Sequence, residues 1–467
     1  MLYRHSSVAA GARRCAPERS RISAQSGQAL LLGIGLLVLC LSAWLLMRQV
    51  GSWVHNKSAL HRATDAAAYS AALAYARNLN LHAYLNRTQL AHQVAQLHLF
   101  SLASAESFRT RLARQASSRN PPASLIGYRF GIHHAAAYLA ARRGGLTDGY
   151  TLTALRDAFA RHDQLIHEVL QQLRASRMDT SLATNKVLHN ILTLNVGQSG
   201  SGDRGKSLEA LGMRYRILHS DMETFVVINR TGDDSWFSML QEVRGRFKYF
   251  DDRRLVVRSF NGINLRCPWM QHQLRRRGSL EISRSGEWRS EENLSFHNLR
   301  FNRYIGCYFR EYPMGWAKIE SSENGPITTE LHDHPLQTFK NKPFWKWAGE
   351  RAWTGWNLFG GARNPLAERW ADQNSLKWRT RGQATYANLN PDFRGDTARI
   401  AIEVEQRWRT YPRLRSTAAA EAYFLFPGRR RASHSEQPSL FKPFWLARLV
   451  PVPPIQSRST DRLWVSK

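Results

Sequence analysis

The sequence predicts an α+β protein in which an N-terminal transmembrane helix extends into one long helix, followed by a helical region and an irregular strand-containing domain. A charge-free apolar run near the N-terminus has the length of a bilayer core. Helical patterning then dominates, whereas 13 of the 15 tryptophans and the alternating strand patterns come after residue 220. These changes divide the chain into a basic leader (1–28), a transmembrane helix (29–47), a helical region (48–200), a strand-containing aromatic and arginine-rich domain (201–430) and a C-terminal tail (431–467).

The apolar run, ALLLGIGLLVLCLSAWLLM at 29–47, carries no charge. At 1.5 Å per residue its helix is about 28 Å long, close to the thickness of a bilayer hydrocarbon core. A cleaved signal peptide is the alternative, but its apolar core usually has about 7–15 residues and ends in a small-residue cleavage site. We therefore expect a retained membrane anchor.

Charges on the two sides of this run predict its orientation. The leader holds five arginines and one acidic residue, Glu18, whereas Arg48, Lys57 and Arg62 follow the run. Positive residues near a membrane helix favour the cytoplasmic side. We therefore expect a single-pass protein of the bacterial inner membrane, with its N-terminus cytoplasmic and its bulk periplasmic.

Helical patterning continues beyond the membrane. Residues 57–115 contain no proline or glycine and are rich in good helix formers, so one helix is expected to run on until Pro121 and Pro122. In a second stretch, the residues of one helix face recur at alternating spacings of three and four, which is typical of a helix that packs on another helix. This seam consists of Leu152, Leu155, Phe159, His162, Ile166, Val169 and Leu173, and we interpret His162 as a packed side chain.

Strand patterns appear in the second half. In RIAIEVEQ (399–406) the residues Ile400, Ile402 and Val404 alternate with Ala401, Glu403 and Glu405, which predicts a half-buried strand. Runs at 224–228, 304–309 and 421–426 predict further strands. Long polar connections separate them, so this domain is expected to be irregular.

The chain has a formal net charge of +30, and 55 of its 66 basic residues are arginines. Clustered cations favour nucleic acid. Here the arginines are scattered, and no known nucleic-acid-binding motif surrounds the two RRR triplets. We therefore expect no specific nucleic-acid partner.

One stretch matches a phosphate-binding loop. GSGDRGKS (200–207) fits G-x-x-x-x-G-K-[ST], with Gly200, Gly205, Lys206 and Ser207 at the fixed positions. An ATPase also needs a strand that ends in Asp to hold magnesium, but the next apolar run, FVVIN, ends in Asn229. The periplasm also lacks ATP, so we interpret this stretch as a flexible turn.

Other catalytic and metal-binding patterns are incomplete. His332 and His334 in LHDHP lack a third ligand, and GQSGS (197–201) has Ser201 where the nucleophile elbow needs Gly. No C-x-x-C pair indicates zinc. The sequence therefore predicts a protein that is not an enzyme and has no catalytic residue, metal or cofactor.

Cys267 and Cys307 are the two cysteines outside the leader and the apolar run. In an oxidising compartment, neighbouring thiols form disulfides. The sequence predicts a disulfide between them, with two separate buried thiols as the alternative.

Three stretches carry a resemblance to a known family. The first begins with GQAL and the apolar run and ends in ATDAAAYSAAL (63–73). The other two are NLHAYLNRTQLAHQVAQ (80–96) and SLFKPFWLARLVP (439–451). They resemble the TadE/TadG-like proteins of Tad (Flp) pilus assembly. The resemblance implies a pilin-like helix whose small alanine face lets a neighbouring helix approach. Gly27 and Gln28 mark the leader junction, but Leu32 stands where processed members have Glu. Cleavage is therefore not expected, and this suits a TadG-type member.

Some TadG-like proteins carry a von Willebrand A domain with a D-x-S-x-S metal site. DDSWFS (233–238) breaks that pattern at Phe237, so this domain and its metal are not expected.

The expected function is therefore that of a non-enzymatic, inner-membrane-anchored protein of Tad (Flp) pilus assembly or of the cell envelope. It would act by helix packing and by periplasmic protein interactions. Its expected partners are other pilus-assembly or pseudopilin proteins of the inner membrane, with no small-molecule ligand. The alternative is a membrane-anchored periplasmic enzyme, a hydrolase in particular.

Overall fold

The structure is a computed structural model of the whole chain. It describes residues 28–144, 150–175, 180–196, 208–210, 212–261, 265–283, 287–323, 342–350, 356–357, 363–407, 413–427, 437–452 and 465.

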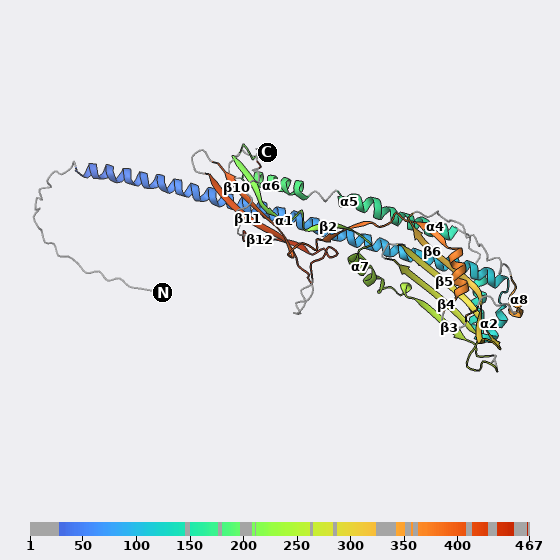
Figure 1. Cartoon of the computed structure of the whole chain (residues 1–467). Helices are drawn as coiled ribbons and strands as arrows, with labels where there is room; N and C mark the ends of the chain where they lie inside the picture. Colours follow the sequence, from blue (N-terminus) through green and yellow to red (C-terminus); the bar gives the residue numbers. More distant parts are fainter. Residues whose placement is uncertain are drawn as a thin grey trace, which may run out of the picture.

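One helix, α1 (Gln28–Ser117), runs through the molecule as its spine. Its 90 residues correspond to about 135 Å at 1.5 Å per residue. The first third of α1 stands free of the body, and all other elements pack along the rest (Figure 1). Leu60 is the first core residue of α1, and the helix ends shortly before Pro121, as the sequence predicts.

Sheet A lies where α1 enters the body (Figure 1). Its strands have the order β1 (Met213–Ser220), β10 (Thr397–Gln406), β11 (Leu414–Phe424) and β12 (Trp445–Val450), and all neighbours are antiparallel. The segment 431–467 was expected to be a tail, and this was wrong for β12. That strand completes the sheet because Ala419–Phe424 of β11 pairs with it.

The alanine-rich face of α1 packs inside the chain. Ala67, Ala68, Ala71 and Ala72 are buried in the same core as Ala418, Ala420 and Ala422 of β11. Small residues on both elements allow the helix and the sheet to approach closely. In this structure, therefore, the face that the resemblance assigns to a neighbouring helix is covered by the protein's own sheet.

Sheet C covers the far end of α1 (Figure 1). Its order is β3-β4-β5-β6-β7, with β8 parallel to β6, and the two-stranded sheet B (β2-β9) is separate. The bounds are β2 (Val226–Arg230), β3 (Arg253–Arg258), β4 (Gln273–Ile282), β5 (Trp288–Asn302), β6 (Gly306–Ser322), β7 (Trp356–Asn357), β8 (Leu376–Arg379) and β9 (Thr385–Leu389). Three helices and a 3₁₀ turn accompany these strands: α7 (Asp234–Arg244), η3 (Lys248–Phe250), α8 (Phe344–Gly349) and α9 (Pro365–Gln373).

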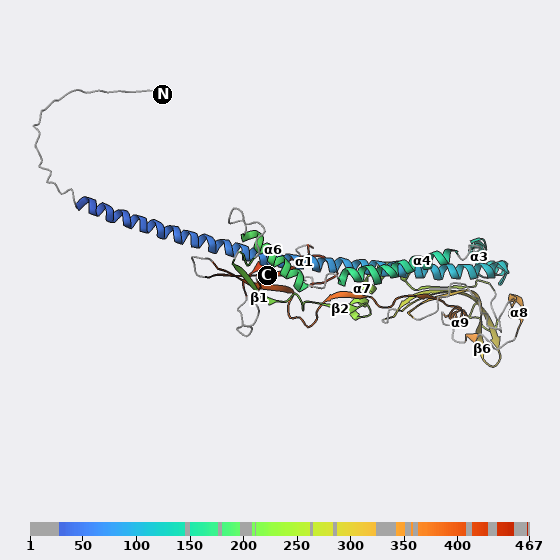
Figure 2. The ribbon, with the colours of Figure 1, turned by 90° about the horizontal axis from the view of Figure 1, so that it is seen from above.

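The remaining helices run back along α1 from its far end. They are α2 (Ala123–Phe130), α3 (Ile132–Gly144), α4 (Tyr150–Gln164), the π-helical turn η1 (Leu165–Leu170), α5 (Gln171–Ala175) and α6 (Thr180–Val196). Figure 2 shows α3 and α4 on one side of α1, with β6 and α9 on the other. The mixed α+β architecture, with a long N-terminal helix, further helices and a strand-rich second half, confirms the predicted fold class.

The π-helical turn η1 corrects the predicted seam. Leu152, Phe159 and Ile166 are buried, whereas Val169 and Leu173 are 44% and 47% exposed. A π turn adds one residue to a helical turn and therefore rotates everything after it. The buried positions become Leu170 and Arg174 instead, four and eight residues after Ile166.

The second correction concerns β10, which is buried on both faces. Ile400, Ile402 and Val404 lie in the core as predicted, but Glu403 and Glu405 on the other face are only 8% and 0% exposed. Arginines of the neighbouring strands cover these carboxylates instead of water. Arg216 contacts Glu403 at 2.7 Å, and Arg214 and Arg415 contact Glu405 at 2.9 and 3.0 Å.

The two halves of the chain share their cores. One core joins α1 residues from Leu60 to Leu79 with strand residues up to Trp445, and a second joins Phe100 with Phe159, Trp288 and Trp378. The predicted boundary at residue 200 therefore separates two kinds of secondary structure that pack on one another along the same spine.

Candidate interaction site

The free part of α1 is apolar, and its large side chains are exposed. From Leu30 to Met47 its large side chains are about half to three-quarters exposed, up to 78% for Met47. Among the described residues, α1 is the one helix that is long and apolar enough to cross a membrane. A contiguous apolar surface of this size indicates contact with a membrane or with another protein. This segment is a candidate membrane anchor.

The two other stretches that carry the family resemblance meet in the structure. Asn80 of α1 donates from Nδ2 to the carbonyl of Trp445 and accepts from the amide of Trp445 at Oδ1, both at 2.9 Å. Asn86, six residues further along α1, donates to the carbonyl of Leu440 at 2.8 Å. Side-chain amides thus hold the C-terminal stretch 439–451 onto α1.

A buried arginine completes this junction. Arg174 of α5 donates to Oδ1 of Asn86 and to Oε1 of Gln89, both at 3.1 Å, and to the carbonyl of Thr385 in β9. Burial lowers the pKa of Arg174 to about 10. These acceptors are amides and a backbone carbonyl, so the junction fastens α1, α5 and β9 together.

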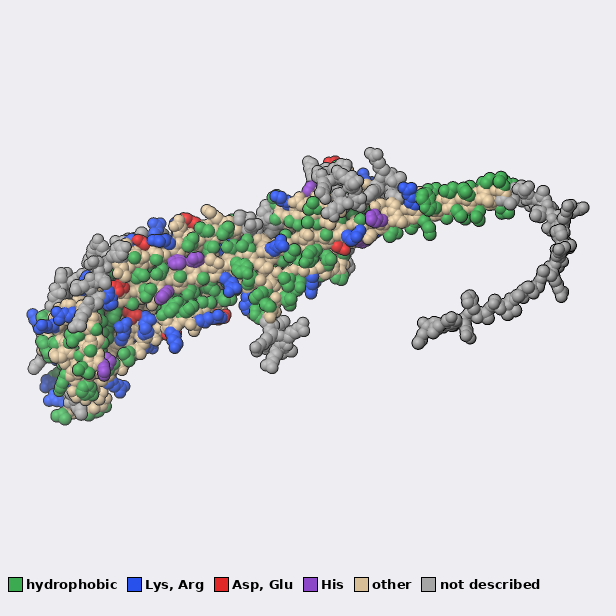
Figure 3. Space-filling model, turned by 180° about the vertical axis from the view of Figure 1, so that it is seen from behind, with side chains coloured by type: hydrophobic (Ala, Val, Ile, Leu, Met, Phe, Trp, Pro, Cys, Tyr) green, Lys and Arg blue, Asp and Glu red, His purple; other side chains and the backbone are tan. Residues whose placement is uncertain are grey.

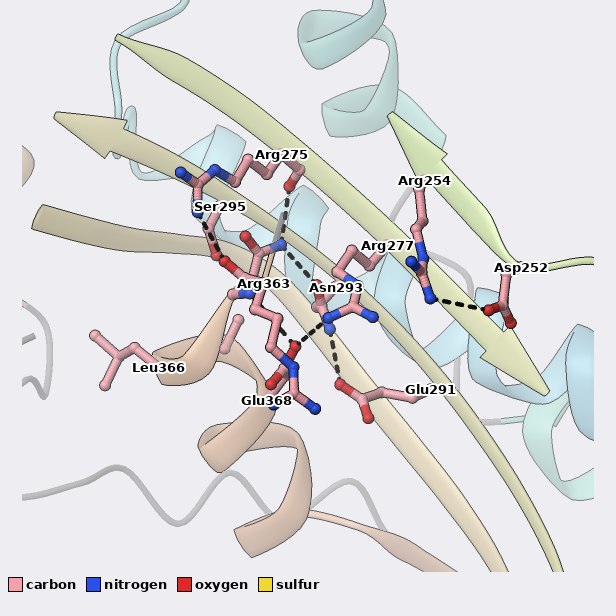
Figure 4. Close-up of polar contacts among 12 residues, drawn as sticks. Asp252, Arg254, Arg275, Arg277, Glu291, Asn293, Ser295, Arg363, Leu366 and Glu368 are labelled. Atoms are coloured by element: carbon pink, nitrogen blue, oxygen red, sulfur yellow. Dashed lines mark hydrogen bonds and ion pairs between the residues drawn. The ribbon is translucent and has the colours of Figure 1, made fainter. Parts of the chain in front are cut away.

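A second buried polar cluster holds α9 on sheet C (Figure 4). Glu311 of β6 accepts from the backbone amides of Leu366 and Ala367 at 2.8 and 3.0 Å, and from the hydroxyl of Ser295 at 2.8 Å. These are amides of the first turn of α9, which have no acceptor within the helix. Asn364 precedes the helix, and its Nδ2 donates a hydrogen bond to Oδ1 of Asn293 at 2.7 Å.

Two carboxyls of this region have the pKa of a possible general acid or base. Burial raises the pKa of Glu311 to about 7, and burial together with the nearby Glu368 raises that of Glu291 to about 7. Perturbed carboxyls can mark catalytic sites. Here the oxygens of Glu311 are occupied by α9 and Ser295, and Glu291 accepts from Asn293 at 2.7 Å. The geometry therefore gives them a structural role.

An apolar pocket of about 480 Å³ opens between α1, α3 and the inner face of sheet C. Among its described lining residues, Arg109 and Arg276 carry charge and pair with Glu106 and Glu292, and His134 also lines it. The pocket can accommodate an apolar group. Its apolar lining residues are Ala105, Phe108, Leu112, Ile126, Ala137, Tyr138, Ala141, Leu255, Val257, Leu274, Leu294 and Met314.

The far end of sheet C carries Cys267 and Cys307, the pair expected from the sequence. Their sulfur atoms lie 2.06 Å apart in a disulfide. It links the β3–β4 loop to the first residues of β6, next to the β5–β6 turn. Exposed aromatic and apolar side chains surround this bridge: Phe260, Leu265, Trp269, Phe301 and Tyr304. We call these five residues, with the bridge, the distal tip.

Several sequence motifs lie outside the described residues: the phosphate-loop pattern at 200–207, GQSGS at 197–201, the His332–His334 pair and Gly27. Gln28 is the first residue of α1. His162 contacts His92 of α1, with their Nδ1 atoms 2.8 Å apart. Within the described part of the chain, no three His, Cys, Asp or Glu side chains are placed to hold a metal ion together.

Sequence analysis did not identify the junction residues Asn80, Asn86 and Arg174. A signal was present, because His82, Asn86, Gln89, Gln93 and Gln96 follow alternating spacings of four and three and are all buried. A polar stripe with the period of a helix-packing seam predicts buried hydrogen bonds. The sequence does not show which atoms accept them.

Comparisons with protein-family models, with curated proteins and with solved structures found no match to this chain.

Proposed function

We propose that this chain is a non-enzymatic protein anchored in the bacterial inner membrane, where it takes part in Tad (Flp) pilus assembly or in the cell envelope. The N-terminus lies in the cytoplasm and the body in the periplasm. The single observation that carries the proposal is the continuity of α1. One helix supplies both the exposed apolar segment and the buried spine of the body.

This continuity suits a scaffold. A body fastened along a helix that leaves the membrane without a break cannot swivel freely at the membrane surface. The carbonyl of Arg415 in sheet A accepts from Lys57 of α1 at 2.5 Å, so the body begins only ten residues after Met47. The proposed protein therefore projects an extended surface outward for other proteins to contact.

Two observations support partners of the pilus-assembly type. The stretches 80–96 and 439–451, which resemble TadG-like proteins, form one hydrogen-bonded junction, so the resemblance falls on a single physical unit. Within the apolar segment, Gly33 and Gly35 have open space where a side chain would stand. Small residues on membrane helices allow a second helix to pack closely.

Deletion of the gene in its host tests this function. We expect loss of Tad-type pili or an envelope defect that the wild-type chain restores. Lys206→Ala should restore it equally, because residues 200–207 are interpreted as a turn. A chain whose residues 1–47 are replaced by a cleavable signal peptide should be exported but fail to restore, because it has no anchor.

Two results would contradict the proposal. One is normal pili and a normal envelope in the deletion strain. The other is nucleotide or ester hydrolysis by the purified full chain, lost in Lys206→Ala or in Ser199→Ala, with restoration in the host lost in the same variant. The second result would favour the hydrolase alternative.

A further inference from the structure

We propose that the distal tip binds an anionic lipid surface, so that the protein bridges the membrane that anchors α1 and a second membrane. The proposal extends the proposed function and rests on it for the anchoring of α1. Lipid binding by the tip itself rests on the exposure, the fastening and the charge of the residues at the far end.

The tip residues project into water to an unusual degree. Leu265 is 93% exposed, Trp269 76%, Tyr304 71% and Phe260 64%. Side chains this exposed do not line a hollow. They stand on the loop between β3 and β4 and on the turn between β5 and β6, which lie at the same end of sheet C because Gln273 pairs with His297.

The loop and the turn are fastened to a rigid base. The Cys267–Cys307 bridge joins them, and the amide of Leu299 donates to Nδ1 of His272 at 3.0 Å. On the α2 side, the amide of Phe260 donates to the carbonyl of Arg129 at 3.1 Å, and Arg129 donates to the carbonyl of Asn261 at 2.9 Å. The described residues of the loop and of the turn are therefore held together at this end of sheet C.

The charged residues beside the tip are basic. Arg258, Arg266 and Arg303 are exposed, and the stretches 258–272 and 298–307, from which the tip residues come, contain no aspartate or glutamate. Arg266 and Arg303 lie over the rings of Phe301 and Tyr304 at 5.2 and 4.5 Å. Figure 3 shows hydrophobic and basic side chains side by side at the end opposite the free helix.

This combination fits a lipid surface. Protruding aromatic and aliphatic side chains with a basic surround are typical of elements that insert into the headgroup region, where tryptophan and tyrosine are favoured. Anionic lipid attracts the arginines.

The tip lies too far from the apolar segment of α1 to contact the bilayer that holds this segment. About 70 residues of α1 lie between Met47 and Ser117, which is about 105 Å of helix. The tip lies at that far end of the molecule (Figures 1 and 2). A tip held at this distance cannot reach the bilayer that holds α1 while the body points outward.

Vesicle capture tests the proposal. The full chain is reconstituted into fluorescent phosphatidylcholine vesicles, which are mixed with dense vesicles of phosphatidylcholine alone or with about one-third phosphatidylglycerol. We expect the dense anionic vesicles to sediment the fluorescence and the neutral ones to do so at least about tenfold less, and we expect salt to weaken capture. The triple variant Leu265→Ser, Trp269→Ser, Tyr304→Ser should lower capture about tenfold.

A matched variant controls for the general basic charge of the chain. Leu165→Ser, Val169→Ser, Leu173→Ser removes three exposed apolar side chains from η1 and α5, away from the tip, and should capture like wild type. Cys267→Ser, Cys307→Ser should reduce capture by loosening the loop. Circular dichroism and thermal unfolding identify any variant that is misfolded.

The proposal is overturned if the natively folded tip variant captures anionic vesicles like wild type, or if neutral vesicles are captured equally. It is also overturned if crosslinking in the host joins the wild-type chain, but not the tip variant, to another protein while the tip variant still captures vesicles. The partner of the tip is then a protein. If the chain resists incorporation into vesicles, the anchor proposal fails instead. Co-sedimentation of the free full chain with anionic vesicles then still tests the tip.

Discussion

Asn86 is fully buried, and both polar atoms of its side chain are occupied. Its Nδ2 donates to the carbonyls of Ala387 and Leu440 at 2.7 and 2.8 Å, and its Oδ1 accepts from Arg174 and from the amide of Ala387 at 3.1 and 3.3 Å. One side chain therefore connects α1 with β9, α5 and the C-terminal stretch.

Replacing this side chain tests its role. Asn86→Ala leaves buried carbonyls and a buried guanidinium without partners, so we expect the free energy of unfolding to fall by about 3–5 kcal/mol. Thr88→Ala, at an exposed position of the same helix, should change it by less than about 0.5 kcal/mol. Urea unfolding of both variants measures the difference, and equal stability would show that Asn86 fastens nothing.

Buried histidines predict how stability depends on pH. Burial, and in each case a nearby arginine, lowers the pKa of His82 and His272 to about 4 and that of His297 to about 3. The folded state therefore resists protonation that the unfolded state accepts below about pH 6.5. Stability is fully present above this value and falls as the pH drops toward these lowered values.

At pH 5 we expect each of these histidines to cost about 2 kcal/mol relative to pH 7.5. His297→Gln keeps a donor for Asn364, which contacts Nε2 of His297 at 2.9 Å, and removes one titrating group. Its stability should therefore fall less steeply with acid than that of wild type. Identical slopes for His297→Gln and the wild type would refute this assignment.

At the scale of elements, sequence patterns identified what they encode locally. The long helix to Ser117 follows from the absence of proline and glycine, and the core face of β10 follows from alternation at Ile400, Ile402 and Val404. What could not be predicted depends on distant partners. Arg214 of β1 and Arg415 of β11 lie on the two strands next to β10, and both form ion pairs with Glu405. They bury the face of β10 that the alternation assigned to solvent.

The π turn η1 is another feature that apolar spacing alone did not reveal. We expect Val169→Gln to be tolerated, because this side chain is exposed, and Leu170→Gln to destabilise the protein by about 2–4 kcal/mol, because it places an amide in the core. Thermal unfolding of the two neighbouring variants measures this. If Val169→Gln lowered the thermal stability more than Leu170→Gln, the result would support the regular seam that the sequence predicted.

At the scale of the molecule, α1 explains why the strand-rich half is not a separate domain. Sheets A and C each bury a face on this one helix. Segments that look independent along the chain, including 439–451, are therefore fastened to it. The shared spine also sets the length of the molecule and the separation of the apolar segment from the distal tip.

In the proposed topology, residues 29–47 anchor the chain in the membrane and the body lies outside the cytoplasm. The most direct measurement fuses a phosphatase that is active only after export behind residue 60 and at the C-terminus, and a reporter that is active only in the cytoplasm before residue 25. We predict activity from all three fusions, with the protein retained in carbonate-washed membranes. An inactive phosphatase at the C-terminus would contradict this topology and would reopen the reading of residues 200–207 as a nucleotide site.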